Sequence, residues 1–589
     1  MTRLRALFEH ILHAFHLFSR RQKIVFGIAA LVCVVTFCSL VYTINRSFTV
    51  LIPAHGGAFS EGVIGVPRFV NPLLALSDTD RDMVTLIYSG LMKIGTGGAL
   101  VPDLASGYTL SDDGLTYTFT LRSATWHDGK PITADDVVFT IEKAQEPATK
   151  SPKRSSWEGV SVKAIDTTHV EFTLKHPYGG FLENATIGIL PKHIWQNVDA
   201  ESFPFFEGNT EPVGSGPYRI EKIEKDTTNV PTSYTLRSFD AYTLGAPYID
   251  QITLRFYPNE DELLAAYQNH AIDATSSVPP ENAQKIEQAG GTILRSAHPL
   301  PRIFALFFNQ NENKIFLDSA VRKALSTAID REGITKNILF NYAEAIDGPL
   351  PPGVIGAATT TPPSLGAARF TEAKKILEKA GWEFDGAAGI YKKTTKQAAK
   401  KGVTATSVTQ ELSFSIATVD TPELKAAAEA VKSDWVKLGA KVTLNIFEIG
   451  DLNQTIIRPR KYDVLFFGEI VGRDPDPFAF WDSSERLDPG LNVALYTNTA
   501  VDKILESARS EGDKEKRAIE YAQFDSLIRA DAPAAFVYAP YFLYGAPSAV
   551  HGISLDGIAS GSDRFLSVAN WYIEQDRVWK IFAPKTTNQ

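Results

Sequence analysis

The pattern of apolar and polar positions is most informative near the middle of the chain. Ile303 to Phe308 is an unbroken apolar run, typical of a strand covered on both faces, and polar residues follow from Asn309. Asp318 or Ser319 can then accept from the free N–H groups of a first helical turn. The apolar face of that helix would consist of Leu317, Val321, Ala324, Leu325, Ala328 and Ile329. The pattern predicts a buried strand followed directly by an amphipathic helix.

Related patterns on both sides of this unit predict an α/β protein. A strand at 412–417, a helix at 423–437 that Gly439 is placed to end, and a strand at 442–447 make a βαβ unit. Further strands are expected at 462–468 and 535–539, and earlier in the chain at 111–122 and 249–257.

Residues 24–44 form a run of 21 residues without charge, which spans about 31 Å as a helix and matches the roughly 30 Å hydrocarbon core of a bilayer. Five basic residues and one acid precede the run, so we expect residues 1–23 in the cytoplasm and the large C-terminal part outside the cell membrane. Residues 4–18 have helical apolar spacing, which predicts an amphipathic segment at the cytoplasmic interface. A cleaved signal peptide and a buried core helix are the alternatives for 24–44. We interpret it as an uncleaved single-pass anchor, because no clear Ala-x-Ala site follows.

Composition narrows the range of functions. At 589 residues the chain is too long for one hydrophobic core, so two or three domains are expected. The net charge of −9 offers no basic surface, and we expect no nucleic-acid partner. Both cysteines, Cys33 and Cys38, lie in the apolar run, and no Gly-x-Ser-x-Gly, His-Glu-x-x-His or P-loop motif occurs. We expect a protein that is not an enzyme and holds no cofactor or metal; a membrane-anchored hydrolase is the alternative.

Several motifs, in one order, resemble a known family. They are Asn71-Pro72, Leu86-Ile-Tyr-Ser-Gly-Leu91, the run from Phe119 through Trp126-His-Asp-Gly129 to Phe139, Pro212-Val-Gly-Ser-Gly-Pro-Tyr-Arg219, Leu306-Phe-Phe-Asn309, and Val321 to Leu325 with Ala328 to Arg331. They are similar to motifs of the peptide- and nickel-type solute-binding proteins of ABC importers, family 5, which includes dipeptide- and oligopeptide-binding proteins. The resemblance covers residues 56–548.

The most specific of these motifs also contains His127, Asp128, Asp135 and Asp136. Taken alone, these residues could suggest a catalytic or metal site. We interpret them as a turn and a helix N-terminus, because Asp-Gly forms turns and the helix dipole favours negative charge there.

The resemblance implies a two-lobe periplasmic-binding-protein-like fold of class II type, preceded by one transmembrane helix. The expected segments are lobe I at 50–93, 212–301 and 535–589, an extra subdomain of lobe I at 94–211, and lobe II at 302–534. Ligand would be held between lobes that close by hinge motion.

The resemblance also implies ligand-binding residues. Backbone groups of Glu469, Ile470 and Val471 would pair with an extended peptide as an added strand. Peptide-binding members commonly have Trp-x-x-Asp-Tyr here, with the Asp on the ligand's amino group, whereas this chain has Arg473 followed by Asp474. Arg473 would repel an ammonium and favour a carboxylate or phosphate. Asp474 can compensate if the loop shifts, and the alternative is that both charges only cap the loop.

Ser77, Asp78 and Trp481 complete the expected ligand-binding residues. The function implied is capture of peptides and delivery to the permease subunits of an ABC transporter by an anchored monomer. The alternative in the same fold is an anchored peptide receptor or chaperone that is not coupled to transport. Nickel complexes and oligosaccharides are the other ligands of this family.

Overall fold

The computed structural model describes residues 18–276, 278–358, 364–396 and 407–583, so the segment predicted at 4–18 lies almost wholly outside the described residues. The chain divides into two compact units, one of residues 1–56 with 572–589 and the other of residues 57–571.

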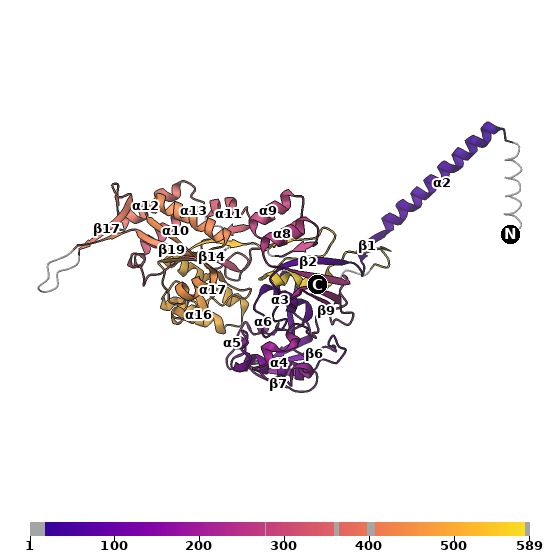
Figure 1. Cartoon of the computed structure of the whole chain (residues 1–589), viewed down its shortest axis with the longest axis horizontal. Coiled ribbons are helices and arrows are strands. Elements are labelled where there is room, and N and C mark those ends of the chain that lie inside the picture. Colours follow the sequence, from indigo (N-terminus) through magenta and orange to yellow (C-terminus); the bar gives the residue numbers. More distant parts are fainter. Residues whose placement is uncertain (1–17, 277, 359–363, 397–406, 584–589) are drawn as a thin grey trace. The chain divides into compact units, whose positions relative to one another are not determined.

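The first unit contains α2 (Arg20–Phe48), β1 (Thr49–Pro53) and β24 (Gln575–Trp579). α2 begins with a capping box between Ser19 and Gln22, and none of its residues is buried. Among the described residues it is the one helix whose length and composition would allow it to cross a bilayer, and it contains the segment predicted at 24–44. β1 follows α2 directly (Figure 1). It pairs antiparallel with β24.

The second unit is built on two main sheets, the first of which we call lobe I with its helices. Its strand order is β13 (Ile293–Arg295), β23 (Leu543–Gly545), β12 (Ala274–Thr275), β2 (Ala58–Ile64), β11 (Gln251–Tyr257), β10 (Pro231–Ser238) and β9 (Tyr218–Lys225). The central β2 runs parallel to β11 and β12. The helices of lobe I are α3 (Asp78–Ile87), α8 (Glu260–Gln268) and α9 (Pro280–Gln288).

The segment predicted as a subdomain, 94–211, contains a four-stranded sheet. Its order is β5 (Ala105–Leu110), β6 (Thr116–Leu121), β8 (His169–Thr173) and β7 (Ser161–Ala164), with α4 (Ala134–Gln145) beside it. Asp136 accepts from the N–H groups of Thr133 and Lys192, each at 2.9 Å, and Asp128 accepts from the N–H of Lys130. These contacts agree with a turn and a helix cap.

The second main sheet, with its helices, is lobe II. Its order is β15 (Ala343–Ala345), β22 (Ala534–Pro540), β14 (Arg302–Phe308), β21 (Val464–Ile470), β19 (Ser413–Val419) and β20 (Lys441–Phe447). Its longer helices are α10 (Ser319–Ala328), α12 (Ala368–Lys379), α13 (Pro422–Leu438), α16 (Thr499–Ser510) and α17 (Lys514–Asp531). Figure 1 shows α10, α12 and α13 grouped beside β14 and β19.

The predicted unit at 303–331 is confirmed as β14 and α10, but Leu317 is not on the buried face of the helix, because it precedes the cap residue and is 60% exposed. β14 is buried along most of its length because β22 and β21 flank it and helices cover it, and Asp318 is the residue that caps α10. The βαβ unit is confirmed as β19, α13 and β20, with Gly439 in the left-handed conformation at the helix end. The boundary placed at 535 stays a prediction; in the structure the chain changes from the lobe II sheet to the lobe I sheet between β22 and β23.

The described chain also contains shorter elements. They are β3 (Met92–Ile94), β4 (Leu100–Pro102), β16 (Glu383–Asp385), β17 (Ile390–Lys396), β18 (Ser407–Glu411), α5 (Arg154–Trp157), α6 (Phe181–Asn184), α7 (Lys192–Trp195), α11 (Arg331–Asn337), α14 (Ile449–Asp451), α15 (Phe478–Trp481) and the 3₁₀ segment η8 (Gly561–Asn570).

A buried ion cluster joins three separate parts of lobe I. The Arg564 side chain of η8 is 0% exposed and donates to Glu61 of β2 at 2.8 Å and to both carboxylate oxygens of Asp82 of α3 at 2.7 Å. Tyr544 donates to the other oxygen of Glu61 at 2.8 Å. Burial lowers the pKa of the guanidinium, but Asp82 and Glu61 raise it more, so Arg564 stays charged. The cluster therefore ties α3 and η8 to the sheet.

Replacing Arg564 by Met should lower the free energy of unfolding by about 3–5 kcal/mol, because two buried carboxylates lose their shared cation. Denaturant unfolding would measure this loss. Arg237→Met is the matched control, since Arg237 forms an exposed ion pair with Glu221 and its loss should cost less than about 1 kcal/mol. Equal losses in the two variants would contradict a structural role of the cluster.

Candidate ligand-binding site

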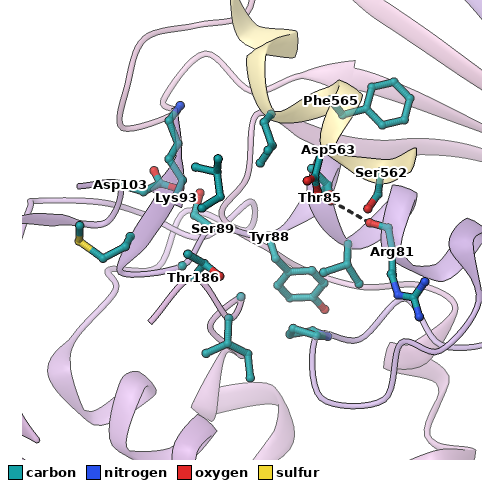
Figure 2. Close-up of a pocket in the computed structure, with 18 of the residues that line it drawn as sticks. Arg81, Thr85, Tyr88, Ser89, Lys93, Asp103, Thr186, Ser562, Asp563 and Phe565 are labelled. Atoms are coloured by element: carbon teal, nitrogen blue, oxygen red, sulfur yellow. Dashed lines mark hydrogen bonds between the residues drawn. The ribbon is translucent and has the colours of Figure 1, made fainter. Parts of the chain in front are cut away.

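A cavity of about 400 Å³ lies between α3, the segment that follows it, the subdomain and η8. Its size is within the range of small-molecule sites, roughly 300–1,000 Å³. α3 contributes Arg81 and Thr85, and η8 contributes Ser562, Asp563 and Phe565 (Figure 2). Because the Arg564 cluster fixes both α3 and η8, it also sets the separation of these two walls.

Tyr88 is one of the residues of this cavity whose hydrogen bonding is incomplete. The side chain is buried, and its hydroxyl has no hydrogen-bonding partner among the described residues. Figure 2 shows the Tyr88 ring in the middle of the lining side chains. Burial raises the pKa of this hydroxyl well above its ordinary value, so it remains a neutral O–H donor. A buried donor without a partner is costly, and a ligand oxygen could satisfy it.

Lys93 and Asp103 form a polar end of the cavity (Figure 2). Burial lowers the pKa of Lys93, and Asp103 opposes this change. Burial raises the pKa of Asp103 to about 6, although Lys93 lowers it in part. The cavity thus offers a hydroxyl, a cation and a carboxylate in a lining that mixes polar and apolar side chains.

Arg473 reaches the cavity from lobe II and is bound by groups of lobe I. Its guanidinium forms an ion pair with Asp563, lies 3.5 Å from a carboxylate oxygen of Glu183, and donates through Nε to the Gly557 carbonyl at 3.1 Å. Asp474 forms a separate ion pair with Arg517 at 2.8 Å. Both charges at this position are therefore compensated by the chain's own side chains.

β21 presents an open edge just before Arg473. Its pairing with β19 covers only Val464 and Leu465, whereas β14 pairs with it along its whole length. The N–H of Val471 donates to the Pro301 carbonyl at 2.8 Å, so the odd-numbered residues direct their main-chain groups toward β14. Gly468 and Ile470 consequently direct theirs to the other side, where no strand pairs with them among the described residues. Of the three residues expected to pair with a peptide, Ile470 faces this open side, whereas the main-chain groups of Glu469 and Val471 face β14.

The side chains of Glu469 and Trp481 lie inside lobe II. Trp481 is buried against Phe307 and Phe536, and its indole N–H donates to Glu469 at 3.2 Å. Burial raises the pKa of Glu469 to about 8, and the bond from Trp481 lowers it only in part. At neutral pH the carboxyl is mainly protonated.

Ser77 and Asp78 lie at the start of α3. Ser77 caps the helix by accepting from the Asp80 N–H at 3.0 Å, and Asp78 is exposed and pairs with Arg81 at 2.7 Å. Arg302, which lies opposite Ile470 in the sheet, is close enough for Asp78 to raise its pKa against the lowering by burial. The structure therefore brings the start of α3 near the open end of β21.

The sequence profile of bacterial extracellular solute-binding proteins, family 5, matches residues 99–487. The chain belongs to this family. The oligopeptide-binding protein AppA of Bacillus subtilis is 29% identical over 499 residues, which cover 83% of this chain and 87% of AppA.

Two solved structures of solute-binding proteins are similar to the whole fold. AppA from Bacillus subtilis in complex with a nonapeptide has a TM-score of 0.67 at 27% identity and covers 89% of this chain and 100% of its own. NikZ from Campylobacter jejuni in complex with Ni(L-His) has a TM-score of 0.67 at 25% identity and covers 87% of this chain and 99% of its own. The two-lobe α/β fold expected of a family 5 binding protein is confirmed.

Sequence reasoning missed several residues of this solute-binding protein's cavity, including Tyr88, Lys93, Asp103 and Asp563. Tyr88 lies within the motif from Leu86 to Leu91, so the resemblance to the family pointed to this segment. The motif does not indicate that the Tyr88 hydroxyl lacks a hydrogen-bonding partner. Asp563 carries no local signal, because its partner Arg473 is 90 positions away.

Glu469 should make the solute-binding protein less stable as pH rises. Its folded pKa of about 8 exceeds the ordinary value of 4.5, so the folded state holds the extra proton between these values. Relative to Glu469→Gln, the unfolding free energy of the natural protein should fall by about 1.4 kcal/mol per pH unit from pH 5 to 8. Denaturant unfolding of both proteins across this range tests it, and parallel pH profiles would contradict it.

Proposed function

We propose that the protein captures extended peptides between its lobes and delivers them to the permease of an ABC importer. The observation that carries this proposal is the open edge of β21 at Gly468 and Ile470, immediately before the cavity wall formed by Arg473. An extended peptide can add to this edge through main-chain hydrogen bonds, which require no particular side chains. The cavity can then receive a side chain of the peptide.

The charges around Arg473 argue against recognition of a free peptide amine by Asp474. Asp474 is already paired with Arg517, and Arg473 is paired with Asp563 and Glu183. Neither side chain offers an unpaired charge to a peptide terminus. We propose that the affinity for a peptide does not depend on the charge of the peptide's terminus. We also propose that Ser77 and Asp78 contact the ligand from lobe I.

We propose that α2 remains as an uncleaved membrane anchor, with residues 1–23 in the cytoplasm and the lobes outside. α2 passes without a linker into β1, and β1 is paired with β24, so the residues that follow the helix are held in a strand pair and are less accessible to a peptidase. The expected partners are the permease subunits and the bilayer, and the protein acts as a monomer without catalysing a reaction.

The direct test is a thermal unfolding assay of the full chain with nonapeptide pools, free and N-acetylated, and with nickel-histidine and oligosaccharides as separate additions. Ligands that bind the folded state raise the midpoint. Equal stabilisation by both peptide pools is expected. Stabilisation by nickel-histidine or sugar alone would refute peptide capture.

Ile470→Pro should weaken peptide binding by roughly tenfold or more, because proline removes an N–H from the open edge and its ring obstructs an added strand. Ile470→Ala is the matched control, since it removes the exposed side chain and keeps the N–H, and its affinity should change less than about threefold. Titration calorimetry with the best-stabilising peptide measures both. Similar losses would show that the side chain is what binds.

Tyr88→Phe should leave the unfolding free energy of the ligand-free protein unchanged or raise it, because the hydroxyl it removes has no partner. The same change should weaken binding of a ligand that accepts from Tyr88 by about twofold to tenfold. Unfolding and calorimetry on the same preparations measure the two effects. A destabilised protein with unchanged affinity would contradict this role.

A further inference from the structure

The C-terminal strand meets the outer end of α2. Thr49, the first residue of β1, pairs with Trp579, the last of β24. The N–H of Lys580 donates to the Phe48 carbonyl at 2.8 Å, and the rings of Phe48 and Trp579 are stacked with 6.3 Å between centroids. These contacts hold Trp579 at the end of the helix.

A turn after Trp579 leaves large apolar side chains uncovered. The N–H groups of Phe582 and Ala583 donate to the Trp579 carbonyl at 2.8 and 3.1 Å. Trp579 is 46% exposed, Ile581 80% and Phe582 76%. Four large apolar side chains, these three and Phe48, thus form one exposed group, which we call the C-terminal apolar patch. Contiguous exposed apolar groups usually mark a contact surface.

The patch is at the depth of a membrane interface if α2 spans the bilayer. Phe48 lies four residues beyond Ile44, the last residue of the apolar run, or about 6 Å along the helix axis. The headgroup layer extends roughly 5–8 Å beyond the hydrocarbon on each side. Aromatic side chains favour this layer, and Arg46, Arg577 and Lys580 beside the patch would face anionic headgroups.

We infer that the C-terminal apolar patch inserts into the outer interface of the bilayer that α2 crosses, so that the turn after β24 contacts the membrane as well as α2. This rests on the proposed anchoring by α2. Ile581 and Phe582 enter the boundary between headgroups and acyl chains, and Phe48 and Trp579 lie at headgroup level. The lipid surface is therefore a second binding partner, separate from the peptide.

Lipid quenching of a fluorophore on the full chain tests the inference. In a Cys33→Ala, Cys38→Ala background, Ile581→Cys carries the fluorophore, and the protein is reconstituted into vesicles of phosphatidylcholine with phosphatidylglycerol and a spin-labelled lipid. Asp576→Cys is the matched control, because Asp576 is exposed on β24 opposite Ile52, away from the end of α2. Quenching at 581 should exceed quenching at 576 by about threefold or more.

The outcomes separate the two proposals. Equal, weak quenching at both positions in an intact, vesicle-bound protein overturns membrane insertion of the patch and leaves the anchor in place. Quenching at 581 that falls as the protein-to-lipid ratio rises also overturns it, because a second copy then covers the patch. A protein that does not float with vesicles, or whose mass shows cleavage after α2, refutes the anchor itself.

Discussion

The Arg564 guanidinium joins three segments that the chain order separates widely: β2, α3 and η8. Burying one cation with two carboxylates gains little net stability over an apolar replacement, but removing one partner leaves a charge uncompensated. The arrangement therefore tolerates only one placement of α3 relative to η8. Tyr88 directly follows α3, and Asp563 directly precedes Arg564. The ion cluster therefore fixes the positions of both walls of the cavity.

The open edge of β21 has an equally simple origin. β19 pairs with β21 only at Ile416 and Ala417, and after Val419 the chain turns through Thr421 into α13, so no residue of β19 pairs with Gly468 or Ile470. β14 nevertheless holds β21 extended along all seven residues. An exposed strand edge is normally a liability in a soluble protein. Here it lies just before Arg473, which lines the cavity, and in the proposed function a bound peptide pairs with it.

The strands and helix ends that depend on residues close in sequence were predicted well. The apolar run at 303–308, the cap at Asp318 and the stop at Gly439 are each specified within a few residues, and each appears as predicted. The partners of Arg473 could not be predicted in this way. The sequence suggested a free cation that favours anionic ligands, but Asp563 and Glu183 come from distant elements and neutralise it. The pairing of β1 with β24 joins opposite ends of the chain and likewise leaves no local signal.

The Arg473 contacts also bear on how lobe II can separate from lobe I. All three bonds of this guanidinium go to lobe I or its subdomain, so they break together when the lobes part. The ion pairs are partly exposed at their rim, and partly solvated pairs contribute on the order of 1 kcal/mol each. Such a contact favours the closed arrangement without locking it, which a protein that must both bind and release its ligand requires. A bound peptide, paired along β21, would then supply the additional free energy that holds the lobes together.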